Sequence, residues 1–152
     1  MIKILFITHS GSVRPPMAEF IMKKMVADEN MGENFYISSA HVQKAEGDKL
    51  DEKARETLEK NGVPPSDKTC QPLAWRDYDM YTTVILMDEE EKWPFMKIIG
   101  GDPEHKVHRL AEYAGIHGDI MNPEKTGDYD TTFRASLSGC AHLYEKLRDW
   151  VK

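Results

Sequence analysis

The segment from Ile4 to Phe20 carries the residues best suited to chemistry, because a short loop of small and polar side chains joins an apolar run to a helix-favouring stretch. No residue from 9 to 14 is proline, so every backbone amide there can donate a hydrogen bond. Successive amides in a tight loop before a helix N-terminus form a concavity for anions. The pattern therefore predicts an oxyanion site, the alternative being an ordinary surface loop. The predicted anion-binding residues are His9, Ser10, Gly11, Ser12, Val13 and Arg14.

Individual side chains of this loop favour the same prediction. Gly11 permits the left-handed backbone conformation that such loops need. Ser10 and Ser12 add hydroxyl groups, and Arg14 adds a planar guanidinium that can bind two phosphate oxygens. The alternative role for Arg14 is to cap the helix that Pro15 and Pro16 open.

Short apolar strands and amphipathic helices alternate along the rest of the chain. This alternation predicts an α/β fold with three layers, a parallel sheet covered by helices on both faces. Ligands of such sheets bind at the carboxyl ends of the strands, at the point where the strand order reverses, which indicates the loop after the first strand. We expect strands over residues 2–8, 34–39 and 82–87 and short extended pieces at 68–73 and near Val107. We expect helices from Pro15, over 50–60 and 88–99, and from Phe133 to Val151.

The composition limits the classes of protein to consider. With 152 residues, the chain is expected to form one domain over residues 1–152. A formal net charge of −6 argues against nucleic acid or a membrane surface as partner. No apolar stretch suits a membrane span or a signal peptide, so we expect a cytoplasmic protein. Cys70 and Cys140 are not spaced as a redox pair and are expected to be buried and free.

Several motifs resemble the low-molecular-weight protein tyrosine phosphatases. Residues 4–19, ILFITHSGSVRPPMAE, are similar to the family's opening strand, its Cys-x5-Arg-(Ser/Thr)-Pro-Met-Ala-Glu motif and the helix that follows. The resemblance spans nearly the whole chain and implies a four-stranded parallel sheet and a phosphate-binding loop at residues 9–14. Further similar stretches are residues 38–40, 77–79, 84–88, 98–103, 114–116 and 126–129.

Two residues differ from the chemistry that the resemblance implies. The nucleophilic cysteine of the family is matched by Thr8, and its general-acid aspartate by Asn122. A helix N-terminus and an arginine can ionise a thiol, whereas an aliphatic hydroxyl needs a neighbouring base. His9 is adjacent to Thr8, but adjacent residues on an extended chain point in opposite directions. An amide at position 122 has no proton to donate to a leaving group.

Other positions of the phosphatase pattern are also altered. The family's serine or threonine after the arginine is Pro15, its loop asparagine is Gly11, and the aromatic residues that flank phosphotyrosine are Glu124 and Lys125. We therefore expect a phosphatase-like protein with impaired catalysis that still binds phosphate or a phosphorylated small molecule or protein.

The alternatives are an active phosphomonoester hydrolase that uses Ser10, Ser12 or His9, and a non-enzymatic interaction module. Arsenate reduction, a related activity of the family, needs cysteines that are absent from the matching positions. No cofactor is expected. His105 and His108 have a spacing that can place both on one helix face, but no third ligand is near, so no metal site is predicted. Residues 93–96 form an apolar cluster, expected to pack in the core or to bind a partner.

Overall fold

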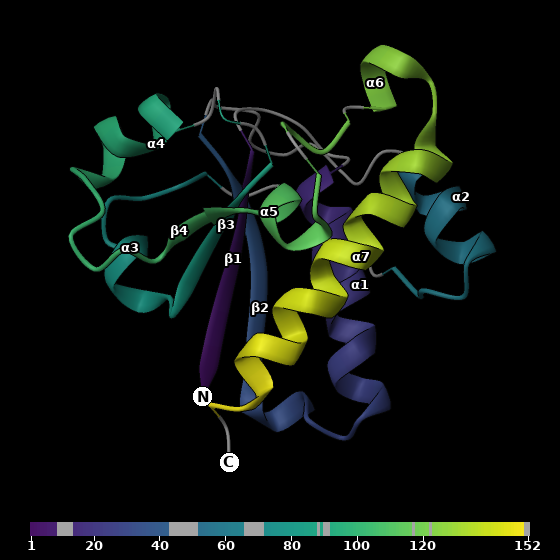
Figure 1. The fold of residues 1–152 in the computed structure, drawn as a ribbon, viewed down its shortest axis with the longest axis horizontal. Coiled ribbons are helices and arrows are strands. Elements are labelled where there is room, and N and C mark those ends of the chain that lie inside the picture. The colour runs from purple at the N-terminus through teal and green to yellow at the C-terminus, as the bar shows by residue number, and fades with distance from the viewer. Residues whose placement is uncertain are drawn as a thin grey trace.

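A four-stranded, wholly parallel sheet forms the centre of the molecule (Figure 1). The computed structural model describes residues 1–8, 14–42, 52–65, 72–87, 89, 92–116, 118–121 and 123–150, and the backbone alone at 8, 14, 15, 124 and 125. The strand order is β2-β1-β3-β4. The strands are β1 (Ile2–Thr8), β2 (Phe35–His41), β3 (Thr83–Leu86) and β4 (Val107–Arg109).

Helices cover both faces of this sheet, which confirms the predicted three-layer α/β fold. Helices α1, α5 and α7 pack on one face, with α2 against α7, while α3 and α4 lie on the other (Figure 1). The helices are α1 (Arg14–Asp28), α2 (Glu52–Lys60), α3 (Asp77–Met80), α4 (Lys92–Ile99), α5 (Leu110–Ala114), α6 (Pro123–Thr126) and α7 (Tyr129–Arg148), and a 3₁₀ turn, η1, spans Gly32–Asn34.

The alternation of side chains along β1 divides the core into two layers. Ile4 and Phe6 face α1 and α7, and Leu5 and Ile7 face α3 and α4. All four are essentially inaccessible to solvent, as expected for a strand covered on both faces. The apolar run at residues 2–8 was therefore correctly predicted as a buried strand.

Three local predictions differ from the structure. The terminal helix, expected from Phe133 to Val151, begins at Tyr129 and extends to Arg148. The helix expected over residues 88–99 is α4, which begins at Lys92, so Pro94 lies in its first turn, where proline is tolerated. His105 and His108 do not share a helix: His105 has a left-handed backbone (φ 52°), and His108 belongs to β4. Extended pairing with β3 overrode the local spacing there.

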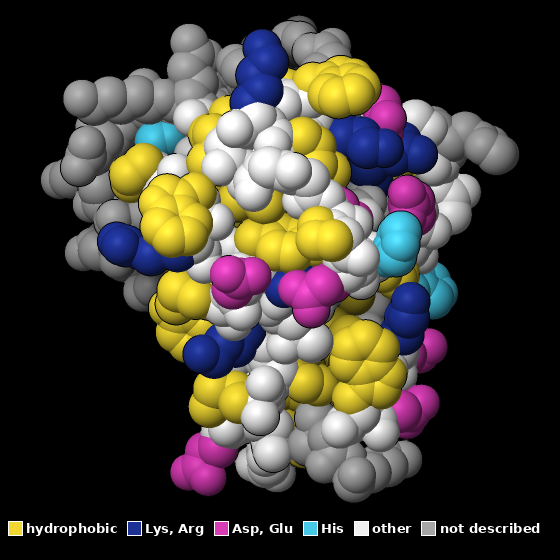
Figure 2. All heavy atoms as spheres, turned by 90° about the vertical axis from the view of Figure 1, so that its left-hand side faces the viewer, with side chains coloured by type: hydrophobic (Ala, Val, Ile, Leu, Met, Phe, Trp, Pro, Cys, Tyr) yellow, Lys and Arg dark blue, Asp and Glu magenta, His cyan; other side chains and the backbone are white. Residues whose placement is uncertain are grey.

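The α3–α4 side of the molecule exposes scattered apolar side chains between charged ones (Figure 2). The predicted cluster at residues 93–96 is divided, since Phe95 is fully buried in the core and Trp93 is 75% exposed. Cys140 is buried and free as expected, and Cys70 lies outside the described residues. Within the described part of the chain, no helix is long and apolar enough to cross a bilayer.

Candidate functional site at the carboxyl edge of the sheet

Both ends of the predicted anion-binding loop lie at the reversal point of the strand order. The chain leaves β1 at Thr8, enters α1 at Arg14, and continues to β2 on one side of β1, whereas β3 pairs on the other side. His9, Ser10, Gly11, Ser12 and Val13 lie outside the described residues. The backbone positions of Thr8 and Arg14 agree with the expected location of the loop.

A buried carboxylate sets the position of α1 along the direction of the strands. Glu19, only 2% exposed, accepts a hydrogen bond of 2.8 Å from the hydroxyl of Ser39 on β2. Its other oxygen lies 2.6 Å from Nζ of Lys23, one turn later on α1. Because Ser39 lies two residues before the end of β2, this contact holds the amino-terminal turn of α1 at the carboxyl edge.

His41 is a site residue that reasoning from the sequence missed. It ends β2, it is 1% exposed, and it is the register partner of Thr8 in the parallel pairing of β1 with β2. Neither Nδ1 nor Nε2 of its ring has a hydrogen-bond partner in the described part of the chain. A sequence signal existed, since a histidine directly follows the Ser-Ser-Ala stretch that ends the second predicted strand.

The segment that contains Asn122 reaches the same edge. The amide of Ile120 donates to the carbonyl of Met87, just after β3, over 3.3 Å. The hydroxyl of Thr132 donates to the carbonyl of Met121 over 2.7 Å. Asn122 itself lies outside the described residues, as do the side chains of Glu124 and Lys125 in α6. The flanking backbone thus lies at the end of β3, beside β1 in the sheet.

Arg109 stabilises the stretch of chain that leads to the segment containing Asn122. Its Nε lies 3.1 Å from a carboxylate oxygen of Glu89, and its Nη1 donates to the carbonyl of Gly118 over 2.7 Å. The amide of Glu89 in turn donates to Asp119 over 2.8 Å. These contacts join the end of β4, Glu89 three residues after β3, and the chain leading to position 122. No pattern in the sequence predicts this role for Arg109.

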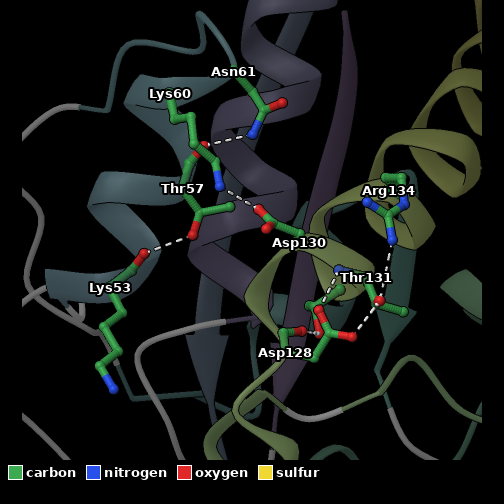
Figure 3. A network of polar contacts seen from close by, with 9 residues as sticks. Lys53, Thr57, Lys60, Asn61, Asp128, Asp130, Thr131 and Arg134 are labelled. Carbon is green, nitrogen blue, oxygen red and sulfur yellow. Dashed lines mark hydrogen bonds and ion pairs between the residues drawn. The ribbon is translucent and has the colours of Figure 1, made fainter.

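Polar contacts also tie α2 to the start of α7 (Figure 3). Nζ of Lys60 lies 2.7 Å from Asp130, and Asp128 caps α7 by accepting hydrogen bonds from the amide and hydroxyl of Thr131. These hydrogen bonds lower the pKa of Asp128. The start of α7 is thereby fixed just beyond α6 and the segment that contains Asn122.

Strongly perturbed ionisable groups lie elsewhere, around the entry to β4. The hydroxyl of Tyr78 donates to Asp102 over 2.6 Å, and burial together with this bond raises the pKa of Tyr78 to about 12. Burial by itself raises the pKa of Asp102, but hydrogen bonds from Tyr78 and the amides of Lys106 and Val107 outweigh it and leave that pKa lowered. This cluster is structural, because its bonds close the turn that leads into β4.

The described residues contain no group of three or more His, Cys, Asp or Glu side chains suited to holding a metal ion. His108 instead has Glu112 as a neighbour, with 3.7 Å between Nδ1 and the carboxylate.

Comparison with known proteins agrees with this geometry. A family model described as "Low molecular weight phosphotyrosine protein phosphatase" matches residues 3–152. The chain is 23% identical over 155 residues to the low molecular weight protein-tyrosine-phosphatase YfkJ of Bacillus subtilis (strain 168), with 97% of each protein covered. The crystal structure of YfkJ has a TM-score of 0.92 at 22% identity and covers 100% of this chain and 98% of its own.

A second solved structure is that of YwlE arginine phosphatase, a cysteine-to-serine mutant with a phosphorylated active-site serine. It has a TM-score of 0.85 at 25% identity and covers 97% of this chain and 96% of its own. The match of the family model over nearly the whole chain, with the same fold, confirms the resemblance found in the motifs. The chain belongs to the low molecular weight phosphotyrosine protein phosphatase family.

Proposed function

We propose that residues 1–152 form a single phosphatase-like domain that binds phosphate or a phosphorylated ligand through residues 9–14 and is impaired in hydrolysis. The observation that supports this most is the backbone geometry: β1 ends at Thr8 and α1 begins at Arg14, at the reversal point of a parallel sheet. A helix N-terminus in that place favours an anion through its amides and its dipole. The family's substrates are phosphorylated compounds, which is in keeping with such a ligand.

The impairment follows from the two replaced groups. Thr8 offers a hydroxyl, which the field of a helix N-terminus does not ionise near neutral pH as it does a thiol. Asn122 has no proton to give to the leaving group, and loss of a general acid typically costs about 10²–10⁴-fold in rate. Both residues stand at the positions that match the family's nucleophile and general acid. We therefore expect the protein to bind a phosphorylated ligand but to hydrolyse it poorly.

The other departures alter the ligand that the site takes. Pro15 has no hydroxyl to bond the nucleophile, and Gly11 has no side-chain amide to order the loop. Glu124 and Lys125 lack aromatic rings, so a phosphotyrosine ring loses its stacking surface. We propose no cofactor, no metal and no nucleic acid or membrane partner, and a cytoplasmic location, in keeping with a net charge of −6.

Titration with phosphate, sulfate and vanadate, followed by calorimetry and by amide NMR shifts, tests the binding half of the proposal. The wild type is expected to bind, and Arg14→Ala to bind about tenfold or more weakly, because charge-assisted hydrogen bonds are lost. Arg134→Ala is the matched control, since that arginine is exposed on the outer side of α7 and donates to Thr131 over 3.2 Å. Absence of anion binding by the wild type would overturn this half of the proposal and favour the other alternative, a non-enzymatic interaction module.

A second candidate function is a phosphatase that uses another hydroxyl or an imidazole in its chemistry, such as Ser10, Ser12 or His9. The phosphorylated serine in the YwlE mutant supports the first step of such a reaction, because a hydroxyl in the active site of this fold accepts a phosphoryl group there. Sustained hydrolysis of an aryl phosphate by purified protein, lost in Arg14→Ala, would support this candidate over the first. Release of less than one equivalent of product would support the first.

A further inference from the structure

We infer that His41 is the base that allows Thr8 to accept a phosphoryl group from an activated phosphate, in a single-turnover reaction. The inference rests on the anion site proposed above, and it adds to that site a residue from β2. The chemical class of donor is an acyl phosphate, whose leaving group is a carboxylate.

The sheet register brings the two positions together. Thr8 and His41 are partners in the pairing of β1 with β2, and paired strands lie about 4.8 Å apart. The preceding partners, Phe6 and Ser39, belong to the face that α1 covers, as their contacts with the core and with Glu19 show. Because side chains alternate along a strand, positions 8 and 41 belong to that same face.

His41 also lies at the height of the first turn of α1. Ser39 is opposite Glu19, and His41 lies two residues further along β2, roughly 6.6 Å closer to the carboxyl edge. Arg14 lies five residues before Glu19, roughly 7.5 Å along the helix axis. Since α1 runs back along the sheet (Figure 1), His41 and the start of α1 reach the same level.

The imidazole is buried without a described partner. A polar group that is 1% exposed and has no hydrogen-bond partner among the described residues costs free energy that a purely structural residue would avoid. An apolar side chain would fill this place at the end of β2 more stably. A ring nitrogen free to accept a hydrogen bond is, however, what a threonine nucleophile needs from a neighbour.

The proposed step balances as follows. Oγ1 of Thr8 attacks phosphorus, its proton passes to a ring nitrogen of His41, and the bond between phosphorus and the acyl oxygen breaks. The carboxylate departs as an anion, so the missing acid at Asn122 does not matter for this donor. The product is a threonine phosphoester, whose hydrolysis requires a poor alkoxide leaving group. The adduct is therefore expected to accumulate rather than turn over.

Incubation of the full chain with acetyl phosphate tests the inference. Intact-protein mass spectrometry is expected to show the mass of one phosphoryl group, and fragmentation to place it on Thr8. Thr8→Val should abolish the adduct, and His41→Asn should slow its formation by about 10²-fold or more. The control His142→Asn should leave the rate unchanged, because that histidine is exposed on α7 and contacts the carbonyl of Ser138.

The same substitution in a Thr8→Cys background separates chemistry from structure. A thiol near a helix N-terminus ionises without a base, so His41→Asn should barely change phosphoryl transfer to cysteine. A large effect with threonine and a small one with cysteine supports His41 as the base. Equal slowing in both backgrounds assigns it a structural role and overturns the inference.

Parallel NMR titration with inorganic phosphate distinguishes the two proposals. Phosphate binding without an adduct on Thr8 overturns the role of His41 and leaves the proposed function standing. An adduct on any other residue overturns the role as well. Absence of both binding and adduct overturns the proposed function and, with it, the inference.

Discussion

The hydroxyl of Ser39 donates a 2.8 Å hydrogen bond to the buried carboxylate of Glu19, and this contact links the end of β2 to the second turn of α1. The link matters for function because the first turn of the same helix borders the candidate anion site. A substitution of Glu19 is therefore expected to change both the stability of the fold and the position of the N-terminus of α1 relative to the carboxyl edge of the sheet.

Glu19→Ala is expected to reduce the free energy of unfolding by about 1–3 kcal/mol, because the Ser39 hydroxyl is left buried without this acceptor. Urea denaturation measures the change. Lys24→Ala is the matched control and should cost at most about 1 kcal/mol, since its ion pair with Asp28 on the same helix is exposed to solvent. Equal losses in the two variants would contradict the importance of the buried contact.

Restoring the family residues is expected to restore turnover in a fixed order. Thr8→Cys alone should produce weak aryl phosphatase activity, and Thr8→Cys with Asn122→Asp about 10²–10⁴-fold more. Asn122→Asp alone should remain inactive, because no thiol is present. Initial rates of aryl phosphate hydrolysis at neutral pH measure the series. Full activity of the single Asn122→Asp variant would show that position 8 is not where catalysis was lost.

Asp102 is expected to contribute to stability at neutral pH but not in strong acid. Its lowered pKa means that the ionised form is favoured in the folded state. The stabilisation is therefore present above the unfolded pKa of about 3.9 and is lost as pH falls through the lower folded value. Asp102→Asn should cost about 2 kcal/mol at neutral pH. It should also flatten the acid limb of the stability curve, which urea unfolding at several pH values would reveal.

Three tyrosines are expected to make the fold sensitive to alkali. Burial is the main cause that raises the pKa of Tyr78, Tyr81 and Tyr144 to about 12 each. Because the unfolded pKa is about 10, their stabilisation is complete below about pH 10 and is lost as pH rises towards 12. Phenolate absorbance should rise together with unfolding, and Tyr81→Phe should weaken the dependence. Phenolate formation without unfolding would contradict this.

The polar contacts around the start of α7 are expected to differ in how much they contribute to stability (Figure 3). Asp130→Asn should change stability by at most about 1 kcal/mol, because Lys60 and Asp130 are both more than half exposed. Asp128→Ala should lower the melting temperature more, since it removes the cap of α7 and its bonds to Thr131. Circular dichroism melts compare the two, and the reverse order would argue against the cap.

The order of strands and helices was largely determined by the sequence. The apolar run at residues 2–8 coincides with β1, and the predicted strands at 34–39 and 82–87 lie within two residues of β2 and β3. Such periodic patterns are local, so they can be recognised without knowing what packs against them. The same holds for the motif from Thr8 to Arg14, which is also local and which indicated the family.

The neighbours of each site residue were decided by the tertiary structure alone. His41 stands beside Thr8 because the register of two strands is set by how their faces pack, which no local pattern of either strand contains. Arg109 meets Glu89 and Gly118 for the same reason, since β3 and β4 end side by side. Helical spacing failed for His105 and His108 because pairing with β3 outweighs a local preference once the chain is packed.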